Sequence, residues 1–139
     1  MPHKYLNKIG INSDDVCIFN TENINIDRCR RERFQKQRKK YGFDERETWA
    51  LDYTLATWLY SHLKMYKKCA SRVVDLSYHK FDIPDWNEPE KVIEVNQKEA
   101  IDIAIKKLKN YLVDEEGSEI KDFQYALRII GIIGPALWW

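Results

Sequence analysis

The sequence predicts a mainly α-helical protein, a single domain over residues 1–139 with about four helices packed around a central aromatic-rich one. Three observations predict this class. Apolar residues recur at helical spacing in one long segment and two shorter ones. An Asp or Asn followed three residues later by Glu, a helix-start signal, precedes two of these segments. A chain of 139 residues with 44% hydrophobic and 32% charged residues can form one core. A short β-hairpin or extended segment is expected in addition.

Residues 1–26 are predicted to be irregular with short strands. Gly10 and the polar cluster at 13–15 are typical of turns. The apolar run at 16–19 fits a strand or the edge of a packed loop. Ile24 and Ile26 alternate with asparagines, so a small hairpin with that run is one option.

Residues 27–41 are predicted to form a basic helix, because Gly42 stands where a helix-ending glycine belongs. Apolar positions are sparse in it, so most of the helix should lie on the surface. Residues 28–40 contain eight cationic residues and a single acid, Glu32, while the whole chain has a net charge of only +1. The eight are Arg28, Arg30, Arg31, Arg33, Lys36, Arg38, Lys39 and Lys40.

Residues 44–68 are predicted to be the central helix, which begins with the capping pair Asp44 and Glu47. Large apolar side chains would cover most of its circumference. Its polar residues would form one narrow wet stripe, so the other helices should pack around it. Asp52 should be paired, with Arg46 or an arginine of the preceding helix as its partner. The stripe comprises Thr54, Thr57, Ser61, Lys64 and Lys68.

The second half of the chain is predicted to contain two packing helices, at 97–113 and 119–134. Before them, residues 73–83 suit a strand or an extended segment, and two prolines enclose a turn. Asn96 and Glu99 cap the first helix, the break at 116–118 ends it, and Pro135 ends the second. Trp138 and Trp139 predict a docked tail, either in the protein's own core or against another subunit as a homo-oligomer.

No pattern in the sequence specifies a reaction, so we expect no enzyme activity, no cofactor and no metal. Glycine-rich phosphate loops, nucleophile elbows and HExxH motifs are absent. The three histidines and three cysteines share no ligand spacing, and an odd cysteine count argues against a disulfide framework. The N-terminus does not resemble a signal peptide, and the longest uncharged stretch, 129–139, is too short to span a bilayer. We therefore expect a cytoplasmic protein that does not bind membranes.

The basic helix is the candidate binding site, and two interpretations of it remain open. Its cations, with Phe34 and Tyr41 between them, could hold phosphates and stack a base. The commoner outcome for such a run is a solvated helix whose charges face acids of the same protein or of a neighbouring subunit. The candidate partner- or phosphate-binding residues are Arg28, Arg30, Arg31, Arg33, Lys36, Arg38 and Arg46.

Residues 41–54 (YGFDERETWALDYT), continued by 58–60 and 63–66, resemble a family of small proteins from phages and prophages of Gram-positive bacteria. The tail at 133–139 (IGPALWW) is similar to the terminal segment of that family. The resemblance implies an accessory protein acting in the host bacterial cytoplasm, by binding rather than catalysis. Its expected role is counter-defence, either by inhibiting a host immune effector such as a CRISPR nuclease or by sequestering a nucleotide immune signal. The alternative is a nucleic-acid-binding accessory protein that uses residues 28–40.

Overall fold

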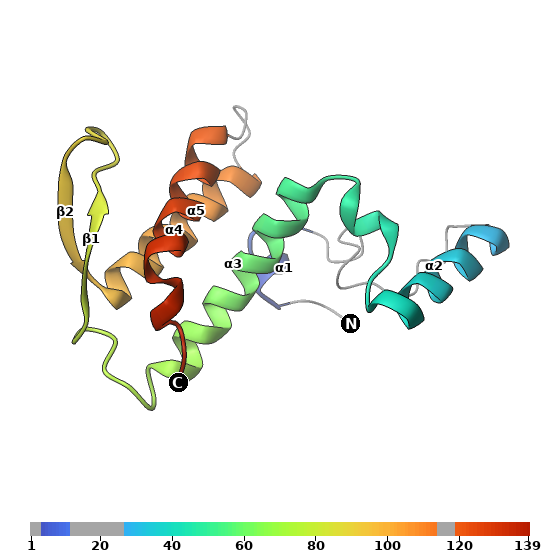
Figure 1. Ribbon diagram of the computed structural model, residues 1–139, viewed down its shortest axis with the longest axis horizontal. Helices are drawn as coiled ribbons and strands as arrows, with labels where there is room; N and C mark the ends of the chain where they lie inside the picture. The colour runs from blue at the N-terminus through green and yellow to red at the C-terminus, as the bar shows by residue number, and fades with distance from the viewer. Residues whose placement is uncertain (1–3, 12–26, 114–118) are drawn as a thin grey trace. The chain divides into compact units, whose positions relative to one another are not determined.

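The computed structural model describes residues 4–11, 27–113 and 119–139 (Figure 1). These residues form five α-helices, two short 3₁₀ turns and one two-stranded antiparallel sheet, so the mainly α class with a short hairpin is confirmed. The chain divides into two compact units, 1–58 and 59–139, and α3 (Leu51–Ala70) contributes residues to both. Each unit is described by itself below, and the expected single domain stays a prediction.

The first unit contains α1 (Lys4–Lys8) and the basic helix α2 (Arg28–Tyr41). The Asp27 carboxylate accepts a hydrogen bond from the Arg30 backbone N–H at 2.8 Å and so caps the start of α2. Gly42 ends the helix in the left-handed conformation with φ 86°, which a side chain would strain. The predicted helix at 27–41 is thus confirmed, whereas the hairpin expected from 16–19 and 24–26 lies outside the described residues.

The predicted start of the central helix at Asp44 is wrong. Asp44 caps a separate 3₁₀ turn, η2 (Glu45–Thr48), by accepting a hydrogen bond from the Arg46 backbone N–H at 3.0 Å. The α-helix begins only at Leu51, after Trp49 and Ala50. The capping signal was therefore real, but it starts a single tight turn.

Helix α3 is amphipathic, which corrects the prediction that it is apolar nearly all round. Its buried residues Ala56, Tyr60, Leu63 and Ala70 are spaced by three, four or seven and share one face. Thr57, expected in the wet stripe, is fully buried. Its hydroxyl donates to backbone carbonyls of its own helix, so burying it leaves no polar group without a partner. By contrast, several large apolar side chains are exposed, namely Leu51, Leu55, Trp58 and Met65.

The second unit is organised around α4 (Gln97–Val113) and α5 (Ile120–Ile133), which lie side by side and run in opposite directions (Figure 1). The bounds predicted for both helices are confirmed to within one residue. The Asn96 side chain caps α4 by accepting from the Glu99 backbone N–H at 2.8 Å. Pro135 lies in η3 (Gly134–Ala136), directly after α5. The buried side chains of the two helices include Ala100, Ile101, Ala104, Ile105, Leu108, Tyr125, Ala126, Ile129 and Ile133.

A hairpin precedes α4, formed by β1 (Lys80–Pro84) and β2 (Val92–Asn96) with Ile83 opposite Ile93. Only the last part of the predicted extended segment 73–83 is therefore a strand, because residues 71–79 form turns. The hairpin is fixed to the helices by the Tyr125 hydroxyl, which donates to the Pro84 carbonyl at 2.6 Å. In the turn, Trp86 packs beneath the Lys107 amine, 3.2 Å from its ring centroid.

The tail is docked through its backbone, while its two indole rings face outward. The Tyr66 hydroxyl donates to the Trp138 carbonyl at 3.3 Å, and the Gln97 amide donates to the Ala136 carbonyl at 3.3 Å. Trp138 and Trp139 are nevertheless 76% and 60% exposed. Docking of these rings in the protein's own core is thus wrong, and contact with another subunit stays a prediction. None of the helices in the described part of the chain has the length and apolar character of a membrane span.

Candidate functional site

The carboxylate of Asp44 organises the region after the basic helix. Asp44 is 1% exposed and forms a two-pronged ion pair with Arg46, from Nε to Oδ1 at 2.9 Å and from Nη2 to Oδ2 at 2.8 Å. Arg38, in the last turn of α2, donates from Nε to the same carboxylate at 2.7 Å. One carboxylate therefore joins α2 to η2, across the turn made at Gly42.

The same contacts set the protonation of two acids. Burial by itself raises the pKa of Asp44, but the hydrogen bonds from the Arg46 side chain and backbone, with the charges of Arg46 and Arg38, outweigh it and lower this pKa below its ordinary value of 3.8. Burial raises the pKa of Glu47, and the nearby Arg38 only partly opposes it. Asp44 is thus held as the anion, while Glu47 takes up a proton more readily.

We expect the stability of the first unit to depend on these two acids with opposite signs. The lowered pKa of Asp44 stabilises the folded state above pH 3.8, and this stabilisation is lost as the pH falls toward the lowered value. The raised pKa of Glu47 has the opposite effect. It stabilises the folded state below pH 4.5, and this stabilisation is lost as the pH rises through the raised pKa. Hydrogen exchange of residues 28–41, measured between about pH 6 and pH 3 and corrected for intrinsic exchange rates, reports this dependence.

Glu47→Gln provides the test, because it removes the Glu47 titration and leaves the Asp44 carboxylate in place. In this variant the stability gained on acidification toward 4.5 should disappear, while the loss below 3.8 remains. Identical pH profiles for the variant and the parent would contradict the assignment.

The structure separates the seven predicted binding residues into paired and unpaired cations. Arg28 pairs with Glu32 at 3.0 Å, Arg30 with Asp27 at 3.3 Å, and Arg33 with Glu45 at 2.6 Å. Arg38 and Arg46 are bound to Asp44 and shielded from solvent, so we assign them to holding the segment together and not to a partner. Arg31 and Lys36 are exposed, and no acid among the described residues pairs with either.

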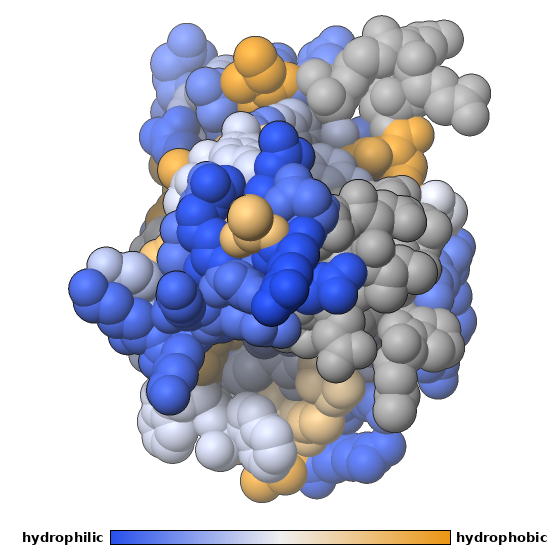
Figure 2. All heavy atoms as spheres, turned by 90° about the vertical axis from the view of Figure 1, so that its right-hand side faces the viewer, coloured by the Kyte–Doolittle hydropathy of each residue, from blue (hydrophilic) through white to orange (hydrophobic). Residues whose placement is uncertain are grey.

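Lys36 belongs to a group of three exposed lysines that we call the lysine face: Lys36, Lys39 and Lys40. Spacing by three and four places them on one side of α2, roughly opposite the buried Phe34. No acid within the described ranges pairs with them. In Figure 2, which views Figure 1 from its right-hand side, hydrophilic residues gather around the centre of the view. Lys39 and Lys40 belong to the basic run but are not among the predicted site residues. Their position on the helix opposite the apolar Phe34 is the sequence signal that could have indicated them.

The two aromatic residues of α2 have different surroundings. Phe34 is 2% exposed and packs edge-on against Trp49, with ring centroids 6.3 Å apart, so it is not available to stack a base. The Arg46 guanidinium lies 4.7 Å from its ring centroid. Tyr41 is 60% exposed beside the lysine face, and the Lys40 amine lies 5.1 Å from its ring centroid. Of the predicted stacking residues, only Tyr41 can meet a ligand.

Comparison of the chain with protein-family models, curated proteins and solved structures found no match. The candidate site therefore rests on the geometry of the chain itself.

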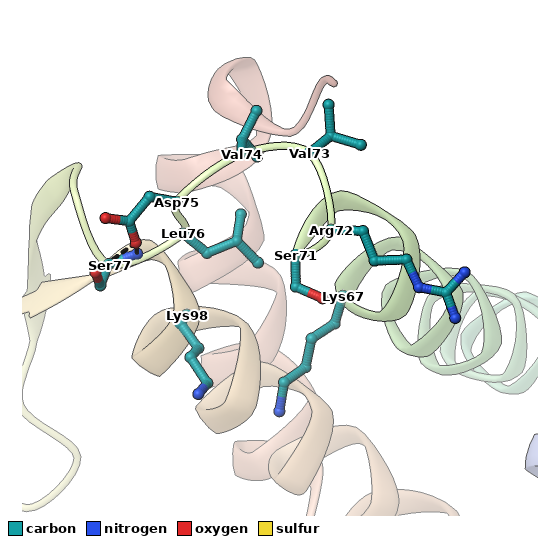
Figure 3. A pocket seen from close by; sticks show the side chains of 9 residues that line it. All are labelled: Lys67, Ser71, Arg72, Val73, Val74, Asp75, Leu76, Ser77 and Lys98. Carbon is teal, nitrogen blue, oxygen red and sulfur yellow. Dashed lines mark hydrogen bonds between the residues drawn. The ribbon is translucent and has the colours of Figure 1, made fainter.

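The second unit contains an open pocket of about 520 Å³ formed by the end of α3, the following loop and the start of α4 (Figure 3). Lys67 and Lys98 extend along the same side of it, whereas the Arg72 side chain points away from the loop. Lys67 pairs with Asp102, and the hydroxyls of Ser71 and Ser77 already donate to the Lys68 carbonyl and to Asp75. Several polar side chains that line this pocket are thus already bonded to other groups of the protein.

No metal site was found in the residues that the structure describes, where no three His, Cys, Asp or Glu side chains are grouped to hold an ion. Cys29 and Cys69 are free thiols.

The exposed cations of α2 can hold a polyanion by charge. The buried groups of α2 and η2 fix the helix in place.

Proposed function

We propose that the chain acts by binding rather than by catalysis, and that its lysine face holds the phosphate backbone of a nucleic acid. The observation that carries the proposal is the division of charge on α2. The arginines near acids fix the helix, while Lys36, Lys39 and Lys40 stay exposed and unpaired by any described acid. Cations left in this way can release counterions from phosphates, which is the main source of affinity in such complexes.

The position of the lysine face at the end of α2 supports an extended anionic partner. Three lysines within five residues span little more than one helical turn, which suits successive phosphates of one strand. Tyr41 follows immediately and is exposed, so an unpaired base beside the bound phosphates has a ring on which to stack. We therefore expect single strands to bind at least as well as duplexes of equal length.

We further propose counter-defence in the host bacterial cytoplasm as the biological setting, from the resemblance to small phage proteins. An inhibitor of an immune effector such as a CRISPR nuclease would use the lysine face on the nucleic acid that the effector needs. A protein that sequesters a nucleotide signal would use it on the signal's phosphates. Turnover of a nucleotide or nucleic acid by the purified protein would contradict this binding role.

The test is a charge reversal on the lysine face. We expect fluorescence anisotropy with a labelled single strand to give a slope of log K against log salt near −2, from about 0.7 per phosphate contact over roughly 50–200 mM salt. Lys36→Glu/Lys39→Glu/Lys40→Glu should lower the affinity at least about tenfold and remove most of this slope. The substituted side chains are exposed and form no described ion pair, and hydrogen-exchange protection of residues 28–41 checks that α2 stays folded with glutamates in its last turn.

Lys98→Glu/Lys106→Glu/Lys109→Glu is the matched control. It changes the net charge equally, at exposed positions of α4. We expect it to weaken binding less than about threefold, through the general field alone. An equal loss in both triple variants, or binding of the parent that does not respond to salt, would contradict the assignment to α2.

A further inference from the structure

A second pocket, of about 570 Å³, lies in the second unit where the loop after α3 meets the end of α5. We call it the aromatic pocket, because its lining includes the rings of Tyr78, His79, Phe81 and Trp138. Its volume is in the range of small-molecule sites. Tyr78 and Trp138 are each 76% exposed, so their faces are open to a ligand.

One wall of the aromatic pocket carries the side chain of Gln97, which is 3% exposed. Its Nε2 donates to the Tyr66 hydroxyl oxygen at 3.2 Å and to the Ala136 carbonyl at 3.3 Å. These bonds use both amide hydrogens. Turning the amide around would set its oxygen against the Ala136 carbonyl, so the network fixes the orientation. Tyr66 in turn donates to the Trp138 carbonyl, which extends the network to the tail.

The carbonyl oxygen of Gln97 therefore has a fixed direction but no donor among the described residues. No fully enclosed side-chain oxygen in that part of the chain lacks a partner. The Gln97 oxygen must consequently reach open volume, and the volume that Gln97 lines is the aromatic pocket. It is therefore a preoriented acceptor that an N–H of a ligand in the pocket can reach.

The remaining lining narrows the ligand class. Among the described residues no lysine or arginine lines the pocket, and Asp75 brings a negative charge to it, so a phosphate would not be held inside. The fitting ligand is a flat ring that stacks on aromatic faces and carries N–H donors on its edge. We propose that the aromatic pocket binds a nucleobase, stacked on Trp138 and Tyr78 and donating an N–H to the Gln97 carbonyl. This site is in a different unit from the lysine face, so either proposal can fail alone.

The test uses the full chain and compares nucleosides with and without an N–H donor on the base, measured by calorimetry. Adenosine and inosine should bind at least about fivefold tighter than N6,N6-dimethyladenosine and 1-methylinosine respectively, whose bases carry no N–H, the loss expected for one hydrogen bond. Trp138→Ala should weaken binding by about five- to 100-fold, the range for one stacked base. The variant keeps the backbone carbonyl to which Tyr66 donates.

Trp139→Ala is the matched control, because Trp139 is exposed and does not line the pocket. It should change the affinity less than about twofold. Equal losses for the two tryptophan variants, equal binding of the methylated nucleosides, or no saturable binding at millimolar concentration would each overturn the proposal.

A second comparison distinguishes a free ligand from a base within a strand. The comparison is made in the lysine-face triple variant, which lacks the proposed phosphate site. An oligoadenylate that binds this variant at least as tightly as adenosine would assign the pocket to a base within a strand, whereas binding of adenosine without binding of the oligoadenylate would assign it to a free ligand. Both results require that Trp138→Ala weakens binding.

Discussion

Asp44→Asn is expected to destabilise the first unit by about 3 kcal/mol, the lower end of the range for breaking a buried ion pair. The replacement keeps the size of the side chain and removes the charge that Arg46 and Arg38 share. Arg46 is 5% exposed, so its guanidinium would remain in a shielded position without a counter-charge. The connection between α2 and η2 would be weakened at the same time. Hydrogen-exchange protection of residues 28–41 should therefore fall by about 100-fold.

Glu32→Gln is the control for this experiment. It removes an ion pair on the same helix, but one whose side chains are 90% and 52% exposed. Such a surface pair contributes little, so protection should change by less than about fivefold. Similar effects of the two substitutions would show that the buried carboxylate does not organise the segment. Comparable protection in Asp44→Asn and the parent protein would lead to the same conclusion.

The limits of α2 could be predicted from the sequence because the signals that set them are local. Asp27 caps the first turn, and Gly42 ends the last one in a conformation that only glycine adopts without strain. Only part of the role of Asp44 could be predicted from the sequence. Its spacing to Glu47 indicates a cap, but the pairing with Arg38 depends on how the chain reverses at Gly42. A sequence pattern does not contain that reversal.

The surroundings of α3 show what periodicity leaves undetermined. Helical spacing allows Ala56, Tyr60 and Leu63 to share one face, but apolar residues occur around most of the helix, so the sequence does not state which face the protein covers. Thr57 is buried because its hydroxyl is satisfied within the helix, whereas Trp58, the next residue, is 45% exposed. Hydropathy alone would predict the opposite, with Trp58 buried and Thr57 exposed. Tertiary packing, and not side-chain type, decides both positions.

The candidate sites were predictable to different degrees for the same reason. The charge run marked α2 as the candidate binding helix and left a solvated helix as the other interpretation. Separating paired from unpaired cations required the positions of Glu45 and Asp44 after the turn. The aromatic pocket left almost no trace in the sequence. Tyr78, Gln97 and Trp138 are far apart along the chain, and only the fold of the second unit brings them to one cavity.

Phe34→Ala should have an effect as large as Asp44→Asn, by a different physical route. Phe34 is the only buried side chain that α2 contributes among the described residues, so the helix has no second apolar anchor there. Removing the ring leaves a cavity next to Trp49 and Arg46 and is expected to cost about 3–5 kcal/mol. An isolated helix of 14 residues is marginal in water, so α2 should then unfold locally.

Binding and stability can be separated with Phe34→Leu, which retains apolar volume and should cost about half as much. If the lysine face must be presented on a folded helix, nucleic-acid affinity should fall in the order parent, Phe34→Leu, Phe34→Ala, in parallel with hydrogen-exchange protection of residues 28–41. The slope with salt should stay nearly constant, because Lys36, Lys39 and Lys40 are still present and a disordered basic segment also releases counterions. Unchanged affinity in Phe34→Ala, with protection lost, would mean that the charge acts without the helix. In that case the chain would still bind a polyanion through these lysines, but the helical arrangement of α2 would not be needed for binding.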